Sequence, residues 1–441
     1  MAETEVDRFD VENPQMALPP SAISTLRTRE TPPQPVFLLS PEAQEAAKQL
    51  VKPTYTDGTL IYGNCSPELI GSSPLGLGNI VYPETTVTWT QHPGGKGLVL
   101  VDRSRIWQMA DPSSNTARSG YLENMYTQIV QGVPGMVLDT AAEKVIGDLD
   151  SISPETASRV EFDFAAVFQE LPFDDTEILK ILEKYAMTEA FASGLYCLYD
   201  SGSGVQAAAA KGQSTGVVTF GLKVTDRKLK PIIHHPQYNI VAKALMLKTE
   251  WQRRMLLAIN PNVRMNADEP YLVSAWSQQM GLKGETILGL LHTQQAVLGP
   301  NGGVHCCGIT DYQALLESGT KVVELDLTGD AFDGSWESAN YAQRFVGVAP
   351  YDDGLQRFLN KHGQLGLGIV PFNENVSAAE ITQLGLRILE ELKQKGVTVD
   401  PRQLIITPVC GAGSETLEKA ADAFNKLPLV CRQMQRELGI K

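Results

Sequence analysis

One histidine and two cysteines are the residues of this chain whose types and spacing best suit chemistry. The motif VHCCG is predicted to end a strand, and side chains on a strand alternate between its two faces. His305 and Cys307 are therefore expected to point to one side and Cys306 to the other. Cys410, in the motif TPVCG, ends another predicted strand and offers a second thiolate. Two thiolates and an imidazole suit Zn²⁺, which keeps an open position where its site is catalytic.

The competing interpretation of these residues is structural. Free cysteine is among the most buried residue types, so a His-Cys pair in a strand can also be core packing. The residue types alone leave both interpretations open. The remaining thiols, Cys65, Cys197 and Cys431, have no comparable context and are expected to be structural.

Carboxylates close two other predicted strands. In one of them Glu324 and Asp326 share a face, and Asp326 lies nearer the strand end, which makes it the preferred fourth metal ligand. Asp268 and Glu269 end the other strand, just before a proline that forces a turn and leaves one carboxylate at the rim. A carboxylate there can bind the ammonium group of a substrate. The alternative is a solvated loop acid or the cap of the next helix.

The elements that must position these residues are short β-rich segments alternating with longer helical ones from about residue 120 onward. Strands are expected at 216–222, 263–268, 303–307, 321–327, 365–370 and 403–407. Helices are expected at 176–196, 236–259, 284–292, 378–394 and 415–438. This alternation indicates βαβ crossovers and a parallel sheet. No glycine-rich dinucleotide-binding loop follows an early strand, so a Rossmann fold is disfavoured.

The positions of the chemical residues favour a closed barrel over an open sheet. Separate predicted strands end at or just before Asp268, His305, Cys307, Asp326 and Cys410. A (β/α)8 barrel builds its active site at the C-terminal ends of its strands. We therefore predict the α/β class and a TIM barrel.

The predicted domain boundaries follow composition. Residues 1–55 carry many prolines among polar residues and are expected to form a Pro-rich, partly disordered arm, with a short helix at 41–51. Residues 56–441 are expected to form a single TIM-barrel domain, in which 56–120 is a variable region.

The composition argues against several classes of protein. The chain has 441 residues, with 37 Lys and Arg against 51 Asp and Glu, and a formal net charge of −14. It lacks the clustered basic surface of a nucleic-acid binder, and an anionic membrane surface is disfavoured for the same reason. No secretory signal, no run of about 18 apolar residues and no disulfide spacing is visible. We expect a cytoplasmic protein with reduced thiols, as a monomer or homodimer, with no nucleic-acid or membrane partner.

Several motifs resemble those of one enzyme family. They are HCCG at 305–308, DEP at 268–270, TPVCG at 407–411, KGQSTGVVTFG at 211–221, GIVP at 368–371 and YLENMY at 121–126. They resemble the catalytic half of cobalamin-independent methionine synthase. They also resemble the wider barrel superfamily that includes uroporphyrinogen decarboxylase and the zinc methyltransferases acting on coenzyme M. The resemblance covers residues 120–438 well and residues 60–120 loosely.

The resemblance implies a zinc-dependent methyl transfer. Zinc would be held by His305, Cys307 and Cys410, and Asp326 stands where the family carries a glutamate that completes the metal set. Coordination removes the proton of a thiol whose pKa is normally about 8.5, and the thiolate then attacks a methyl group. The expected catalytic residues are the three zinc ligands and Asp268.

The implied substrates are homocysteine, which would give methionine, and a methyl donor. Asp268 matches the acid that binds the homocysteine amino group, with Glu269 beside it in the substrate site. Gly71 and Ser72 lie in a segment, IGSSP, that resembles the turn facing the substrate carboxylate. Full-length methionine synthase resembles two fused barrels; this chain is expected to form one, and so to lack the folate surface shared between the two. A methylcorrinoid, free or on a corrinoid protein, is the first expected donor, and methyl-tetrahydrofolate is the second.

Two alternatives stay open. A related barrel enzyme would decarboxylate tetrapyrrole carboxylates, or alkylate coenzyme M or another thiol; a decarboxylase pocket would bind several carboxylates with arginine and would not depend on zinc. A non-catalytic, zinc-stabilised corrinoid-binding protein would instead have closed four-ligand coordination that ignores added thiol.

Overall fold

Most of the chain from residue 125 to residue 439 is described by a computed structural model, together with seven short strands nearer the N-terminus. Within that range the description leaves out residues 140–141, 143, 170, 172, 188–209, 259–262, 278–280, 300, 309, 311, 329–351 and 411–416. The early strands are β1 (Asp7–Arg8), β2 (Pro35–Leu38), β3 (Thr54–Thr56), β4 (Thr59–Ile61), β5 (Asn79–Ile80), β6 (Thr88–Gln91) and β7 (Leu98–Val101). The helix expected at 41–51 lies outside the described residues, and the arm and the variable region stay predictions.

The main sheet has seven strands in the order β16-β15-β14-β13-β12-β10-β5. The strands after β5 are β10 (Ala210–Thr215), β12 (Val263–Asp268), β13 (Gly303–Cys306), β14 (Val322–Asp326), β15 (Gln364–Val370) and β16 (Leu404–Pro408). These six are parallel to one another, whereas β5 pairs antiparallel with β10. The α/β class with a parallel sheet is therefore confirmed. A closed barrel of eight strands is not seen in the part of the chain that the structure describes.

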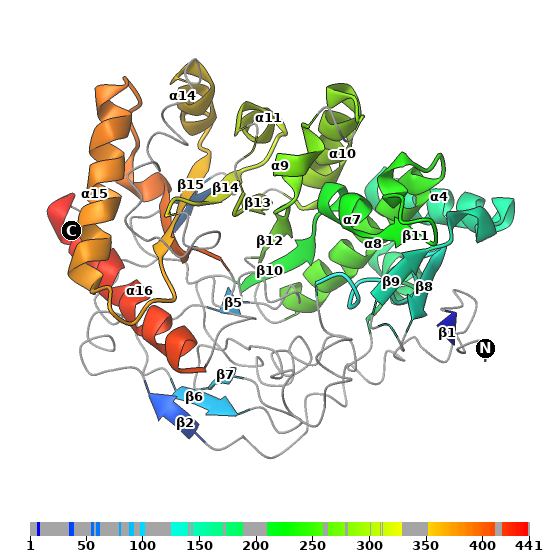
Figure 1. The fold of residues 1–441 in the computed structure, drawn as a ribbon, viewed down its shortest axis with the longest axis horizontal. Helices are drawn as coiled ribbons and strands as arrows, with labels where there is room; N and C mark the ends of the chain where they lie inside the picture. The colour runs from blue at the N-terminus through cyan, green and yellow to red at the C-terminus, as the bar shows by residue number, and fades with distance from the viewer. Residues whose placement is uncertain are drawn as a thin grey trace.

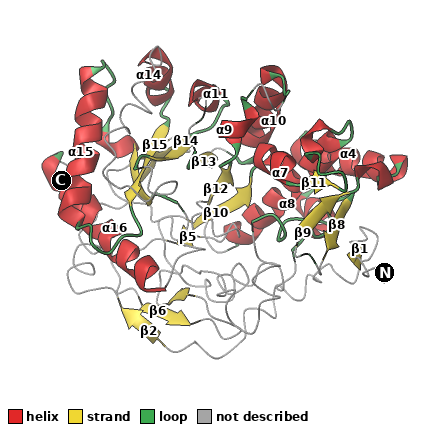
Figure 2. Ribbon diagram, viewed as in Figure 1, coloured by secondary structure: helices red, strands yellow, loops and turns green. Residues whose placement is uncertain are grey.

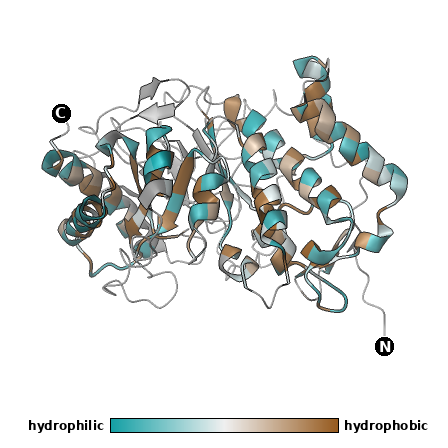
Figure 3. Cartoon of the chain, turned by 90° about the horizontal axis from the view of Figure 1, so that it is seen from above, coloured by the Kyte–Doolittle hydropathy of each residue, from teal (hydrophilic) through white to brown (hydrophobic). Residues whose placement is uncertain are grey.

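Helices connect successive strands of this sheet and lie outside the arc that the strands follow (Figures 1 and 2). They are α7 (Val217–Lys223), α8 (Tyr238–Leu257), α9 (Leu272–Ala275), α10 (Gly284–Val297), α11 (Tyr312–Glu317), α14 (Asp352–Asn360), α15 (Ala378–Gln394) and α16 (Leu417–Glu437). In α15 a capping box of Ser377 and Glu380 begins the helix, and Ile381, Leu384 and Ile388 recur on one buried face. Figure 3 shows this two-sided hydropathy, with brown and teal faces on the same helices.

A second, smaller sheet has the strand order β1-β8-β9-β11. Its remaining elements and the helices beside it are β8 (Met136–Asp139), β9 (Lys144–Gly147), η3 (Leu149–Ser151), α4 (Pro154–Phe168), α5 (Asp175–Glu183), β11 (Thr225–Asp226) and η4 (Ile232–His234). Ser153 caps α4 by accepting a 3.1 Å hydrogen bond from a backbone amide, and a capping box of Asp174 and Glu177 begins α5. Because β11 directly follows α7, this sheet is tied to the main one through the end of α7.

One expected strand is a helix. Residues 216–222 were predicted as a strand from their β-branched and aromatic side chains, but 217–223 form α7 and the strand beside them is β10. The correction has a physical reason: the carboxylate of Glu269 accepts hydrogen bonds from the first free amides of α7, which a strand would not present. The other five expected strands and the helices α8, α10, α15 and α16 lie where they were predicted, with ends shifted by a few residues. The expected helix 176–196 is described only as α5.

The two faces of the main sheet differ in polarity. One face packs apolar side chains against the helices: Met265, Ala267, Val304, Val323, Leu325, Leu365, Leu367 and Ile369. The other, called here the polar face, carries polar side chains that are buried as well: Gln213, Thr215, Arg264, Asn266, Asp268, His305, Glu324 and Thr407. Parallel strands are ordinarily apolar on both faces, and a buried polar group is costly without a partner. The polar face is therefore where a functional site is to be sought.

A buried ion pair crosses this polar face. Arg264 on β12 donates from Nη2 to Oε1 of Glu324 on β14 at 2.6 Å, and their side chains are 5% and 0% exposed. Two glycines make room for these large side chains. An added Cβ at Gly303 would lie 2.4 Å from Oδ1 of Asn266, and one at Gly366 would lie 2.5 Å from Cγ of Glu324. The strands can thus carry long polar side chains inward only because their neighbours are small.

Candidate metal centre

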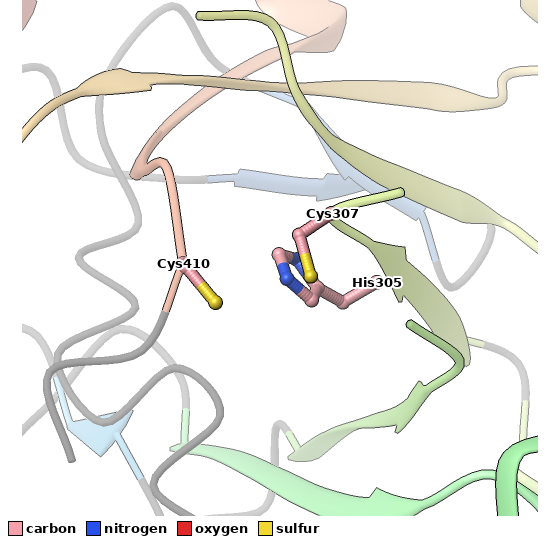
Figure 4. Close-up of side chains that lie close together, drawn as sticks. All are labelled: His305, Cys307 and Cys410. Carbon is pink, nitrogen blue, oxygen red and sulfur yellow. The ribbon is translucent and has the colours of Figure 1, made fainter. Parts of the chain in front are cut away.

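His305, Cys307 and Cys410 meet at the C-terminal end of the main sheet. One ligand atom from each residue lies within 4.8 Å of the other two, and the three side chains point toward one another in Figure 4. His305 is on β13, Cys307 comes directly after that strand, and Cys410 lies two residues past the end of β16. In a flat sheet β13 and β16 would stand roughly 14 Å apart. The sheet therefore bends toward its polar face, which brings the two strand ends together.

The neighbouring Cys306 faces the other way. Its side chain is 1% exposed and belongs to the hydrophobic core between sheet and helices. Its thiol donates a 3.4 Å hydrogen bond to the carbonyl of Gly308, and burial raises its pKa to about 12. This arrangement agrees with the alternation expected along the strand. Cys306 is a core thiol, whereas Cys307 joins His305.

The three side chains fit a zinc ion by their chemistry and spacing. Zinc bonds of about 2.3 Å to sulfur and 2.0 Å to nitrogen put tetrahedral ligand atoms roughly 3.5–3.8 Å apart, and the three ligand atoms here all lie within 4.8 Å of one another. The pKa of Cys307 is raised well above its ordinary value. The largest cause is a hydrogen bond with Cys410, and the second is burial of the thiol. The thiol of Cys307 is therefore protonated at neutral pH until a cation takes the place of its proton.

The two candidates for a fourth ligand, Asp326 and Glu324, differ in position. Asp326 is not in the group of three, and its Oδ1 accepts hydrogen bonds from the amide and hydroxyl of Thr328 at 2.7 and 2.9 Å. It is still near enough to contribute to the raised pKa of Cys307. Glu324 lies deeper and is paired with Arg264. Asp326 as a ligand stays a prediction, and Glu324 is engaged elsewhere.

Asp268 lies beside the metal group on the next strand. It pairs in register with His305, so both side chains share the polar face. Asp268 is 2% exposed, and Nε2 of Gln213 donates a 2.8 Å hydrogen bond to its Oδ1. The carboxylate is thus held in one orientation, near the position that a metal-bound ligand would occupy.

Glu269 is built into the start of α7. Its carboxylate accepts hydrogen bonds from the amides of Val218 at 3.1 Å and Thr219 at 2.7 Å, and from Nε2 of Gln294 at 3.2 Å. A Cβ at Gly216 would lie 2.1 Å from this carboxylate, so glycine is needed there for Glu269 to pack. Glu269 therefore positions α7, and its predicted contact with substrate is untested. Gly71 and Ser72 lie outside the described residues.

The buried carboxyl of Glu269 predicts a pH dependence of stability. Burial raises its pKa to about 7, and the hydrogen bonds from Thr219 and Val218 only partly oppose this. The unfolded chain loses this proton at about pH 4.3, so folding should become less favourable as pH rises from about 4.5 to 7, by up to about 3 kcal/mol. We expect Glu269→Gln to lack this part of the slope. Urea unfolding of both proteins at pH 5 and pH 7.5 measures it, and equal slopes would contradict the assignment.

Three further residues stand at the rim of this centre, and none of them was among the expected site residues. Lys223 ends α7 and donates a 2.9 Å hydrogen bond to the hydroxyl of Tyr271. Tyr126 lies close to Tyr271 and to Cys307. Its pKa is raised by burial first, then by Tyr271 and then by the thiol of Cys307. Lys223 was missed because residues 216–222, directly before it, were expected to form a strand, so that no helix end was expected at Lys223. Tyr126 ends the motif YLENMY, which carried a resemblance but no role.

None of the helices among the described residues is both long and apolar enough to cross a membrane.

No family model and no curated protein sequence matches the chain. Among solved structures, the chain is similar to a B12-independent methionine synthase from a Shewanella species, in complex with selenomethionine. The two share 13% sequence identity with a TM-score of 0.36, and the similarity covers 52% of this chain and 63% of that chain. The chain is also similar to a methyltransferase from Methanosarcina mazei, with 12% identity, a TM-score of 0.30, and 50% and 57% covered. The chain thus spans less than two thirds of either protein, and at these values neither similarity assigns an activity.

Proposed function

We propose that this protein is a zinc-dependent methyltransferase that transfers a methyl group to the thiol of a small amino acid, with homocysteine as the first candidate. The observation that carries the proposal is the group of His305, Cys307 and Cys410 at the C-terminal end of the sheet, with Asp268 beside it. Three protein ligands leave one of four positions open to a substrate. A closed structural site would fill that position with a fourth side chain.

In the proposed thiol activation, one group of residues binds the metal and another binds the substrate. Zinc, when bound, supplies the positive charge that lowers the pKa of a coordinated thiol. His305, Cys307 and Cys410 hold it at the strand ends, where the surrounding side chains are mostly buried. Asp268, oriented by Gln213, offers a carboxylate for the ammonium group of the substrate. The chain then needs no nucleophile of its own, because the substrate thiolate attacks the methyl group of the donor.

The methyl donor is proposed to be a methylcorrinoid, free or carried by a corrinoid protein, with methyl-tetrahydrofolate as the second choice. In either case the donor must reach the metal-bound thiol in line with its methyl group. The proposal for the donor rests on the single-barrel resemblance of the sequence.

The polar face gives less support to the decarboxylase alternative. Such a pocket needs arginines that are free to bind several carboxylates. On the described strands, Arg264 is the arginine of the polar face, and its guanidinium is already paired with Glu324. The non-catalytic alternative needs a fourth protein ligand, and the group formed by the described residues has three.

Metal analysis of the purified chain tests the proposed function directly. We expect about one zinc per chain after reconstitution, and an additional sulfur neighbour in the zinc X-ray absorption spectrum when L-homocysteine is added. L-Serine, which has a hydroxyl in place of a thiol and a shorter side chain, serves as the control and should leave the spectrum unchanged. A zinc spectrum that does not change with any added thiol would indicate a structural site, and a chain that binds no zinc would rule out the proposal.

A further inference from the structure

Lys223 holds its ammonium group over two aromatic rings at the rim of the metal centre. Its Nζ lies 5.0 Å from the ring centroid of Tyr271 and 6.0 Å from that of Tyr126, in addition to its hydrogen bond to the Tyr271 hydroxyl. The side chain of Lys223 is exposed, and within the described part of the chain no carboxylate forms an ion pair with it. A cation is thus held in a fixed place and still has room for an anionic partner.

Backbone contacts attach this group to the strand ends that bear the metal residues. The hydroxyl of Thr215, at the end of β10, donates to the carbonyl of Met125, which fixes the adjacent Tyr126 there. Thr215 pairs in register with Asp268, which in turn pairs with His305. Lys223, Tyr126 and Tyr271 therefore stand at the same end of the sheet as the metal group.

We propose that Lys223, oriented by Tyr271 and Tyr126, binds the carboxylate of an amino-acid thiol whose sulfur is at the metal and whose ammonium group is at Asp268. This subsite rests on the proposed function and names its substrate class. An ammonium and a carboxylate recognised by opposite charges, with the sulfur fixed as a third point, also distinguish the L from the D amino acid. The carboxylate contact is assigned to Lys223 instead of the segment around Ser72 that the sequence resemblance suggested.

A role of Lys223 in substrate binding and a purely structural role predict different results when Lys223 is replaced. A surface cation over an aromatic ring contributes a small amount to stability, whichever thiol is present. A recognition role instead changes the relative affinities of thiols with and without a carboxylate. The decisive quantity is therefore a ratio of dissociation constants, which does not depend on knowing the methyl donor.

The experiment uses the full chain with Co²⁺ in place of zinc, and follows the sulfur-to-cobalt absorption band during titration with four thiols. These are L-homocysteine, the same molecule without its carboxylate (3-aminopropanethiol), without its amino group (4-mercaptobutanoate), and without both (propanethiol). We expect Lys223→Met to weaken the two carboxylate-bearing thiols by about 10–100-fold and to leave the other two within about twofold. Asp268→Asn should weaken the two amines instead.

Two variants complete the design. Lys228→Met removes another exposed lysine, five positions along the chain on the turn after β11, and should leave all four affinities unchanged. Tyr271→Phe removes only the hydroxyl that holds the Lys223 ammonium, so it should cause a smaller loss confined to the carboxylate-bearing thiols.

The outcomes separate this subsite from the proposed function. If Lys223→Met weakens all four thiols equally, or none of them, Lys223 does not bind the carboxylate and the subsite is rejected while metal-bound thiol stands. The thiolates of Cys307 and Cys410 already give a sulfur-to-cobalt band in the cobalt-loaded chain, so the readout is its increase when a thiol binds. If no thiol changes the band in the unmodified chain, the proposed function fails and the subsite fails with it.

Discussion

Replacing Cys307 with serine should remove the metal, whereas replacing the adjacent Cys306 with serine should leave it in place. Cys307 supplies one of the three clustered ligand atoms, and Cys306 lies in the core on the opposite face of the strand. Loss of residues that merely orient a metal ligand costs about 10–100-fold in affinity, so loss of a ligand should cost at least about 100-fold. Metal content after dialysis against a zinc chelator, measured per chain by mass spectrometry, gives the result.

The pair of variants is its own control, because both remove one sulfur from neighbouring residues. Cys410→Ser should behave like Cys307→Ser, although the two positions are about a hundred residues apart. Cys306→Ser places a hydroxyl in the apolar core and should lower the unfolding free energy by about 1–3 kcal/mol without loss of zinc. Equal zinc retention by Cys306→Ser and Cys307→Ser would refute the assignment of the metal ligands.

Breaking the buried ion pair of the polar face should cost about 3–5 kcal/mol of unfolding free energy. Arg264→Met removes the guanidinium 2.6 Å from Glu324 and leaves a carboxylate whose side chain is fully buried. The cost arises from the remaining charge, because water cannot reach it in the folded chain. Urea or guanidinium unfolding, monitored by circular dichroism, measures the difference.

Two further variants isolate this cause. The double change Arg264→Met with Glu324→Leu removes both charges and should recover most of the lost free energy. Lys393→Met breaks an exposed pair with Glu390, 3.9 Å apart with side chains 76% and 58% exposed, and should change stability by less than about 1 kcal/mol. A loss for Arg264→Met no larger than that of Lys393→Met would mean that the pair does not neutralise a buried charge.

Local patterns predicted the parts of this fold that depend on short-range periodicity. The alternation along β13 separated Cys306 from its two neighbours, and the helix expected at 378–394 has the same bounds as α15. The same approach failed for residues 210–223, because β10 has the sequence AKGQST, which lacks the apolar pattern of a strand and buries Gln213 and Thr215 on the polar face. The β-branched residues after it were then taken for the strand, although Glu269 fixes them as a helix.

The candidate site depended on contacts that no local pattern contains. Residue type and face left Glu324 open beside the preferred Asp326. The partner that occupies Glu324, Arg264, is 60 positions away on another strand. Lys223 and Tyr271 are likewise brought together by α7, whose existence was not predicted. Residue type and strand position could therefore single out the candidate metal ligands and Asp268, but they could not say which neighbouring side chains were already paired with other residues.

The separation of Cys307 and Cys410 along the chain also sets when the centre can form during synthesis. The two residues are about a hundred positions apart, and two whole strands, β14 and β15, lie between β13 and β16 in the sheet. At ribosomal rates of about 5–20 residues per second, the second cysteine is made roughly 5–20 s after the first. A nascent chain that has exposed His305 and Cys307 but not yet Cys410 therefore carries only two of the three residues of the group. The group of His305, Cys307 and Cys410 assembles only once β16 has joined the sheet, so loading of the proposed metal would report that the chain has been made at least to Cys410 and that its last strand is in place.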